Sequence, residues 1–256
     1  MKFFGPKDIK FFVKKYLNDN KELFKNKIII DIPTGTGTSS EILTGLGALV
    51  EPYDLFPEFF KVDGLKCNKA DALKKLPIDN NHANFVLCQE GMEHFENQLF
   101  VLKEFNRILK KNGILILTTP NYSKLKSRIS YLLAESESFF KIMPPNELDS
   151  IWVNNSNGSK DIYFGHIFLI GIQKLRMLAK LAGFRIKKIN PVRINRTSLY
   201  LLPFIYPFIF IVNHLSYFRA LKKKERNPCQ RKEKSVPRVD KIKSRLKNFD
   251  QFTPVY

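Results

Sequence analysis

The sequence predicts an α/β domain built on a doubly wound, mostly parallel sheet. Between residues 28 and 120, short runs of β-branched and apolar residues alternate with segments in which apolar residues recur at helical spacing. The first run, from Ile28 to Ile32, ends in a turn that contains Gly35 and Gly37. Strands that alternate with helices in this way pair in parallel and carry helices on both faces.

The expected elements follow in chain order. An amphipathic helix over 7–25 precedes the first strand at 28–32, and the glycine turn leads into a helix over 39–46 with Thr38, Ser39 or Ser40 as its N-cap. The later strands are expected at 48–54, 65–68, 84–89, 114–119 and 184–189. The later helices are expected at 97–111, 127–133 and 173–181.

Polar residues gather where the predicted strands end. Asp54 lies 23 positions after Asp31 at the end of the second strand, where a carboxylate can accept both hydroxyls of a ribose. The alternative is a surface Asp that caps the next helix. Ligands bind beyond the carboxyl ends of such strands. We therefore expect one ligand site lined by Asp31 to Gly37, Asp54, Asp71, Gln89 to His94, and Asn121.

On these residues the sequence resembles the class I S-adenosylmethionine-dependent methyltransferases, and most closely their bacterial small-molecule and glycan branch. Ile29 to Gly37 matches the first motif, hydrophobic-hydrophobic-Asp-hydrophobic-Gly-x-Gly-x-Gly. Met92-Glu93-His94-Phe95 resembles a frequent Leu-Glu-His segment, and Thr119-Pro120-Asn121 resembles a frequent Thr-Pro-Asn. The match is good over 28 to about 121 and loose over 165–184. It implies a Rossmann-like, seven-stranded sheet and S-adenosyl-L-methionine as cofactor.

The resemblance also implies cofactor-binding residues, all at the carboxyl ends of the first four strands: Asp31, Thr34, Gly35, Gly37, Asp54, Leu55, Asp71, Ala72 and Gln89. The glycine turn would lie against the methionine part of the cofactor, and Asp31 would steady that turn or meet the amino group through water. Asp54 would bind the ribose. Asp71 would meet the adenine amino group, beside a backbone contact from Ala72, and Gln89 would line the pocket.

Pro33 stands where the family has its first glycine. Proline fixes φ near −65° and has no N–H to donate, so the turn has one backbone donor fewer. Because Gly35 and Gly37 remain, we expect cofactor binding to survive. A degenerate domain that binds no cofactor is the alternative.

Methyl transfer to a hydroxyl needs a general base. His94 and His166 are the candidate catalytic residues, and Glu90 and Glu93 are further candidates at the same sheet edge. The ordinary pKa of histidine suits proton removal near neutrality. Each histidine also has a structural alternative. His94 could pack on the cofactor pocket or cap the next helix, and His166 could make a local loop hydrogen bond.

Residues 122–165 do not resemble sheet, and an insert after the fifth strand is well placed to act as a lid that selects the acceptor. In its helix, over 127–133, we expect Ile129, Leu132 and Leu133 to face inward and Arg128 outward. The methyltransferase domain would then span 1–196, and 197–256 would be an appended segment.

The appended segment begins with a strongly apolar run over 199–218, and a basic cluster follows as far as 234. This order predicts peripheral or monotopic contact with an anionic membrane through 199–234. Three alternatives remain open. The run could be buried or form a dimer contact, it could supply a last hairpin of the sheet, or it could span the membrane.

Charge and cysteine content bound the class of protein. The formal net charge is +19 and the pI about 9.8, which favours an acidic partner such as nucleic acid, anionic lipid or a phosphorylated glycan. A lysine-rich genome would give the same bias. Cys67, Cys88 and Cys229 form no CxxC, which indicates a reducing compartment without a disulfide framework or zinc site. The N-terminus turns polar too early for a signal peptide, so we expect a cytoplasmic protein, with peripheral attachment to the cytoplasmic membrane face as an option.

Together these features predict an S-adenosylmethionine-dependent methyltransferase that O-methylates a small molecule, a sugar or a lipid-linked glycan intermediate, with a quinone-type lipid precursor as a close competitor. An RNA methyltransferase is the second hypothesis, because of the charge. Against it, neither an Asn/Asp-Pro-Pro-aromatic motif nor a Pro-Cys nucleophile is in place. A non-catalytic, membrane-bound scaffold on a degenerate domain is the third.

Overall fold

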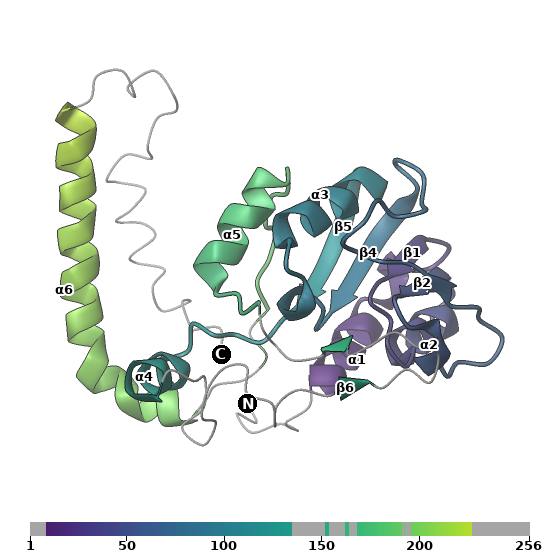
Figure 1. The fold of residues 1–256 in the computed structure, drawn as a ribbon, viewed down its shortest axis with the longest axis horizontal. Coiled ribbons are helices and arrows are strands. Elements are labelled where there is room, and N and C mark those ends of the chain that lie inside the picture. Colours follow the sequence, from purple (N-terminus) through teal and green to yellow (C-terminus); the bar gives the residue numbers. More distant parts are fainter. Residues whose placement is uncertain are drawn as a thin grey trace.

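The computed structural model describes residues 9–134, 152–153, 162–163, 168–190, 192 and 196–226. Within these residues the central sheet has five strands in the order β3-β2-β1-β4-β5 (Figure 1). They are β1 (Ile28–Asp31), β2 (Leu49–Asp54), β3 (Asn68–Lys69), β4 (Ala83–Gln89) and β5 (Leu109–Thr118). Every pair in this sheet is parallel, which confirms the predicted α/β class.

The described helices are α1 (Ile9–Asp19), α2 (Thr38–Gly45), α3 (Gln98–Ile108), α4 (Leu125–Ala134), α5 (Ile172–Leu181) and α6 (Arg196–Arg226). Short 3₁₀ turns lie at Lys21–Leu23 (η1), Pro57–Phe59 (η2) and Met92–His94 (η3). A separate antiparallel pair joins β6 (Trp152–Val153) to β7 (Ile162–Tyr163).

The sheet is buried on both faces, as a doubly wound fold requires. Along β1, Ile29 packs in one apolar cluster with residues of α1 and α2, whereas Ile30 packs in a second cluster with residues of α3 and α5. Both side chains are buried, at 1% and 0% exposure. Successive side chains of a strand point to opposite faces, so the isoleucine run of β1 contributes to both layers.

The expectation of seven strands is not confirmed, because the described central sheet has five. The segment 184–189, expected as the sixth strand, forms no ladder, and its Ile186 and Ile189 are each 41% exposed. The alternative of a last hairpin is also wrong, since residues 199–218 lie within helix α6. In both segments an apolar composition did not specify a strand, because among the described residues no neighbouring strand pairs with either of them.

Several helix boundaries differ from the prediction, and helix α1 ends at Asp19 rather than at 25. Helix α3 ends at Ile108 rather than at 111, because Leu109 already pairs with Ala83 in the sheet. The register then passes to Ile114 opposite Phe85, so 110–113 bulges out with Asn112 at a φ of 64°. At α2 the N-cap is Gly37, and none of the three predicted hydroxyl residues caps the helix.

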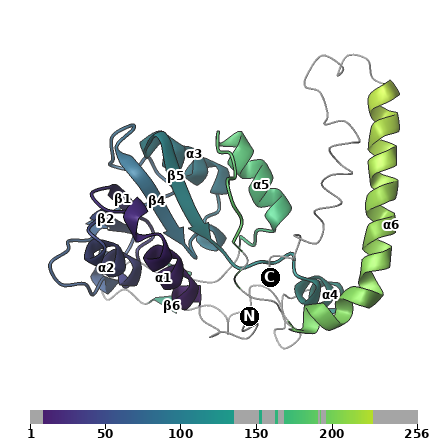
Figure 2. The same ribbon diagram turned by 180° about the vertical axis from the view of Figure 1, so that it is seen from behind.

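Helix α4 faces a different way from the prediction. Arg128 is exposed as expected, but Leu132 and Leu133 are 82% and 70% exposed instead of facing inward. The buried side of α4 carries Ser127 and Ser130. Helix α6 contacts α4 and otherwise stands apart from the sheet (Figures 1 and 2). The lid role of 122–165 and the domain boundary at 196 remain predictions.

We predict that Phe105→Ala, in the α3 face that packs on the sheet, lowers the free energy of unfolding by about 3–5 kcal/mol. Phe105 is 0% exposed and belongs to the larger apolar cluster, so truncation leaves a cavity. Phe204→Ala is the matched control, because Phe204 is 74% exposed, and its effect should stay within about 0.5 kcal/mol. Urea unfolding followed by circular dichroism measures both, and equal effects would contradict the described core.

Candidate functional site

The carboxyl ends of β1, β2 and β4 form one edge of the sheet, and a buried carboxylate lies beneath the glycine turn there. Asp31, the last residue of β1, is 1% exposed. Its Oδ2 accepts hydrogen bonds from Ser40 Oγ at 2.6 Å and from Thr34 Oγ1 at 3.0 Å. Burial raises the pKa of Asp31 to about 6, although the two hydroxyls oppose the shift. In this geometry Asp31 steadies the turn from below.

Asp54 joins the end of β2 to the same turn. Its Oδ2 accepts the Gly35 N–H at 2.8 Å, and its Oδ1 accepts the Phe56 N–H at 3.0 Å. The alternative of a surface Asp is excluded, because Asp54 is 8% exposed. Leu55 follows it with 40% of its surface exposed, so an apolar side chain borders the carboxylate.

The two glycines of the turn have different surroundings. Both have positive φ, +55° at Gly35 and +85° at Gly37, a backbone conformation that glycine adopts readily. A Cβ at Gly35 would meet no atom within 4 Å, so the backbone there is open to a ligand. At Gly37 a Cβ would collide with the Phe60 ring and lie 2.6 Å from Val62 Cγ2. The chain after β2 therefore packs directly against the start of α2.

Pro33 also has a specific neighbour. A Cβ on Gly91, which lies in the loop after β4, would fall 2.6 Å from Pro33 Cδ. Gly91 thus makes room for the ring that replaces the first glycine of the motif. The Ile32–Pro33 peptide bond is cis. No local sequence pattern indicates this role of Gly91, because its contact with Pro33 joins residues far apart in the chain.

The remaining predicted cofactor residues lie on adjoining loops. Gln89, at the end of β4, accepts a hydrogen bond from Ser39 Oγ at 2.7 Å, which links β4 to α2. Asp71 follows β3, and its Oδ1 accepts the Leu73 N–H at 2.9 Å. The Asp71 side chain is 28% exposed and Ala72 is buried. A backbone hydrogen bond of 2.8 Å from Ala70 to Asp54 ties this loop to β2.

A second group of polar residues follows β4. Glu93 is 0% exposed, and its Oε2 accepts the Thr119 hydroxyl at 2.9 Å. Its Oε1 is buried without a hydrogen-bond partner among the described residues. Glu90 accepts the Thr118 hydroxyl at 2.9 Å. Burial, and then the charge of Glu90, raise the pKa of Glu93 to about 7.

The chain after the insert closes on this second group. The Phe168 N–H donates to the Glu93 carbonyl at 3.0 Å, and Gln98 Nε2 donates to the Phe168 carbonyl at 2.7 Å. His94 is partly buried next to Glu93 in η3. His166, the other catalytic candidate, lies outside the described residues.

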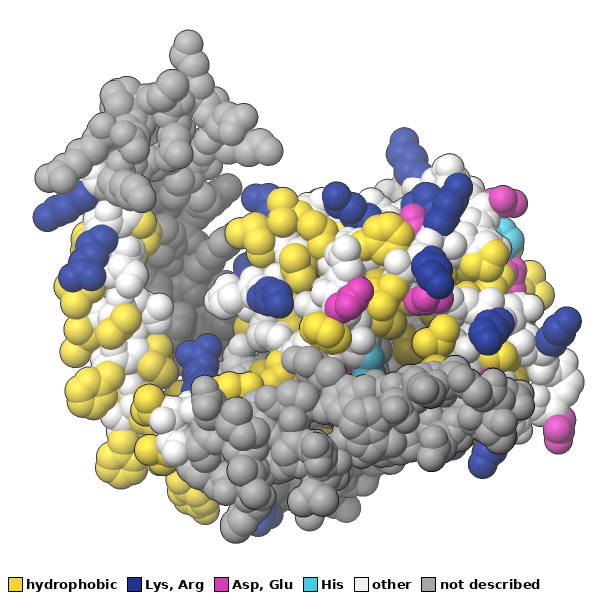
Figure 3. All heavy atoms as spheres, viewed as in Figure 1, with side chains coloured by type: hydrophobic (Ala, Val, Ile, Leu, Met, Phe, Trp, Pro, Cys, Tyr) yellow, Lys and Arg dark blue, Asp and Glu magenta, His cyan; other side chains and the backbone are white. Residues whose placement is uncertain are grey.

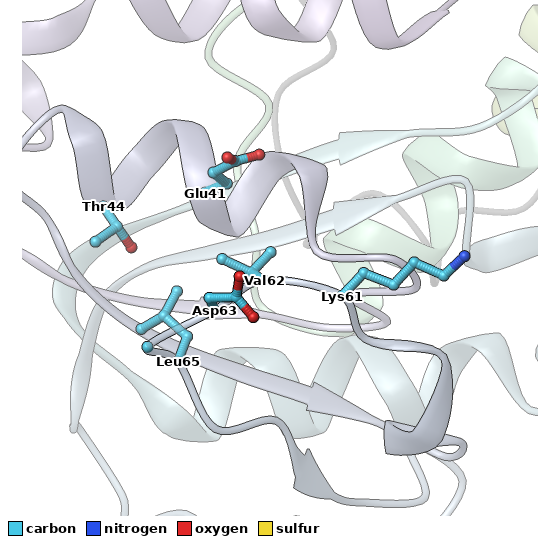
Figure 4. Close-up of a pocket in the computed structure, with 7 residues that line it drawn as sticks. Glu41, Thr44, Lys61, Val62, Asp63 and Leu65 are labelled. Carbon is cyan, nitrogen blue, oxygen red and sulfur yellow. The ribbon is translucent and has the colours of Figure 1, made fainter.

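A hollow of about 440 Å³ lies between α2 and the loop after η2 (Figure 4). It is lined by Glu41, Thr44, Lys61, Val62, Asp63, Gly64 and Leu65. None of the nine predicted cofactor residues lines it. The hollow is therefore distinct from the sheet edge where Asp31, Asp54 and Gln89 meet.

A family model described as a methyltransferase domain matches residues 7–189, which is most of the chain. The chain belongs to the S-adenosylmethionine-dependent methyltransferases. The match includes all five strands of the central sheet and every predicted site residue. The resemblance inferred from the sequence motifs is thereby confirmed.

Curated relatives of this methyltransferase chain carry quinone names. A ubiquinone biosynthesis O-methyltransferase of Glaesserella parasuis is 26% identical over 52% of this chain and 66% of its own length. One of Colwellia psychrerythraea is 32% identical over 51% of this chain and 56% of its own length. A demethylmenaquinone methyltransferase of Chlorobaculum tepidum is 32% identical over 36% of this chain and 40% of its own length. The chain thus spans less than two thirds of these relatives.

Solved structures agree with the fold. The YcgJ protein of Bacillus subtilis superposes with a TM-score of 0.54 at 13% identity, over 70% of this chain and 71% of its own. A protein of Bacillus halodurans described as a methyltransferase superposes with a TM-score of 0.52 at 18% identity, over 68% of this chain and 70% of its own. None of these matches supports the nucleic-acid hypothesis.

For the methyltransferase domain we predict that Gly91→Ala lowers the free energy of unfolding by about 1–3 kcal/mol, because the new methyl group meets the Pro33 ring. Adding Pro33→Gly should recover at least about 1 kcal/mol of that loss. A double-mutant cycle by urea unfolding measures the coupling. Gly45→Ala is the control, since a Cβ there meets nothing within 4 Å. Additive effects of the two changes would refute the contact.

The raised pKa of Glu93 predicts a pH dependence. Its folded-state value of about 7 lies above the ordinary 4.5, so its contribution to stability is complete below pH 4.5 and is lost as the pH rises through 7. Glu93→Gln has no proton to lose. Relative to this variant, the wild type should lose up to about 3 kcal/mol of unfolding free energy between pH 4.5 and pH 8. Parallel curves in urea unfolding at several pH values would contradict the burial of an ionisable Glu93.

Proposed function

We propose that this chain transfers a methyl group from S-adenosylmethionine to a hydroxyl of a small-molecule acceptor. The observation that carries the proposal is the hydrogen bond between the Asp54 carboxylate and the Gly35 N–H. It holds an acidic side chain and an open glycine backbone side by side at the carboxyl edge of the sheet, where ligands of such folds bind.

The residues at this edge fit the cofactor that the family uses. Asp54 has lone pairs left to accept the ribose hydroxyls, and Leu55 offers exposed apolar surface for the adenine. Gly35 lets the methionine part approach the backbone. We propose that Asp71 and the backbone of Ala72 bind the adenine amino group. Thr34, Gly37 and Gln89 would form the wall of the pocket, and Asp31 would support the turn from below.

The bound cofactor supplies a methyl group on a positively charged sulfur, which is open to in-line displacement. The chain's own task is to orient the acceptor oxygen and to accept its proton. We propose that His94, which follows β4 at this edge, is the general base that accepts the acceptor's proton. We propose His166 as the second catalytic residue. As the acceptor oxygen would bond to the methyl carbon, the carbon–sulfur bond would break with its electron pair left on the sulfur, and the proton of the acceptor O–H would pass to the imidazole.

Buried Glu93 lies next to His94 in the chain, with one carboxylate oxygen on Thr119. We propose that it positions the turn of His94, because its backbone carbonyl also holds the chain that returns from the insert. In this arrangement the insert, 122–165, serves as the lid over the acceptor.

For the acceptor we propose an amphiphilic hydroxyl compound, and first a quinone-type ring precursor. The support is the names of the curated relatives, two of which are ubiquinone biosynthesis O-methyltransferases. A lipid-linked glycan intermediate is the second candidate, favoured by the exposed apolar helix α6, which suits any acceptor held in a membrane. We propose a cytoplasmic domain that is attached to the anionic membrane face through 199–234.

We predict that Asp54→Asn weakens S-adenosylmethionine binding about tenfold or more. The amide turns one acceptor oxygen into a donor that faces the Gly35 N–H or the ribose. Asp63→Asn is the matched control, because this exposed Asp lies in the separate hollow. Isothermal calorimetry measures both affinities. Equal affinities would refute the assigned role of Asp54, and no binding by the wild type would favour the degenerate scaffold.

Methyl transfer is tested by incubating the purified chain with radiolabelled S-adenosylmethionine and either a quinone-precursor extract or a lipid-linked glycan extract. Label in one extract identifies the acceptor class, and His94→Gln should then lower the rate about a hundredfold or more with little change in cofactor affinity. Cofactor binding without transfer to either extract would reject the proposed acceptors, and label in added RNA would revive the nucleic-acid hypothesis.

A further inference from the structure

Helix α6 has exposed apolar side chains on opposite sides. Phe204 and Phe208 are 74% and 70% exposed, while Phe210, Ile211 and Val212 are 45%, 54% and 60% exposed. At 100° per residue, Phe210 points almost opposite to Phe208, whereas Ile211 and Val212 lie within about 60° of it. By length and composition, one helix of the described chain, over Arg196–Lys222, could cross a membrane.

The charged residues of α6 lie at its ends. No Asp, Glu, Lys or Arg occurs in the 22 residues from Thr197 to Phe218. At 1.5 Å per residue this run is about 33 Å long, close to the thickness of a bilayer hydrocarbon core. The His214 ring lies 4.2 Å from Phe210 and 6.1 Å from Phe218, between two aromatic neighbours. Five basic residues follow before the helix ends: Arg219, Lys222, Lys223, Lys224 and Arg226.

Helix α4 extends this apolar surface. It packs against α6, where Ser198 Oγ accepts the Lys126 N–H at 3.3 Å, and Ser127, Ser130 and Ser198 are all 0% exposed. Small residues on the joined sides let the two helices approach closely. The α4 leucines, Leu132 and Leu133, are consequently left facing outward.

We propose that α4 and α6 form one membrane-binding unit, in which α6 enters the hydrocarbon region of an anionic bilayer and Leu132 and Leu133 of α4 enter beside it. Figure 3 shows apolar side chains along the visible side of α6, with basic side chains toward its far end. Those cations meet anionic headgroups where the apolar run stops. The proposal is independent of the methyl-transfer reaction.

A bilayer fits this unit better than a second copy of the chain does. A helix pair covers one stripe of each helix and leaves a polar face in water, but α6 has no polar face over the uncharged run. Pro203 and Pro207 also lie inside the helix, a position that membrane helices tolerate better than isolated helices in water. A bilayer covers all sides of α6 at once.

The test is flotation of the full-length chain with phosphatidylcholine vesicles, with and without phosphatidylglycerol. The wild type should float with both, and at least about tenfold more of it should float with the anionic vesicles. Leu132→Asp with Leu133→Asp, on α4, should lower the bound fraction about tenfold. Met177→Asp with Leu181→Asp is the matched control, because these α5 side chains are 58% and 59% exposed on the body of the domain.

A second variant addresses α6 directly: Phe204→Asp, Phe208→Asp and Ile211→Asp together should abolish flotation. Circular dichroism checks the fold of each variant, and if the triple variant does not fold, the exposed α4 pair decides. A wild type that does not float, or an α4 pair that floats as the wild type does, overturns the proposal. A third outcome would also overturn it: light scattering shows that the wild type is a dimer in the absence of vesicles, the triple variant is a monomer, and the wild type does not float.

Discussion

The glycine turn after β1 is held between two carboxylates, and the candidate site depends on this arrangement. Asp31 lies beneath the turn and takes two hydroxyls, while Asp54 lies beside it and takes the Gly35 N–H. Hydrogen bonds to a buried carboxylate are among the stronger ones in proteins, because the surroundings screen them little. The charge of Asp54 also contributes to raising the pKa of Asp31. The turn is thus fixed by side chains from two neighbouring strands rather than by its own sequence alone.

Much of this site could be predicted because parallel strands bring their ends together. The spacing from Asp31 to Asp54 and the polar residues after β4 are enough to locate the edge from the sequence. The partners inside the edge were not predictable in the same way. Ser39 and Ser40 are typical N-cap residues, yet they bind Gln89 and Asp31, because tertiary hydrogen bonds override the local capping preference.

The errors of the sequence analysis concern segments whose partner was unknown. Residues 184–189 have the composition of a strand but pair with no strand in the part of the chain that the structure describes. Leu132 and Leu133 were expected to face inward, because an apolar residue on a helix is normally buried. The serines of α4 occupy the buried side instead, since α6 packs there. In both places the result was decided by another element and not by the local pattern.

The contact between Pro33 and Gly91 couples the residue types that two distant positions of the chain can accept. A proline at the first place of the glycine motif is compatible with the fold only while residue 91 has no side chain, and a side chain at 91 requires the ring to be absent. A side chain at residue 91 is therefore disfavoured while Pro33 is present, although the two positions lie on different strand ends. Grafting the motif of this chain into another methyltransferase would require both residues to be moved together.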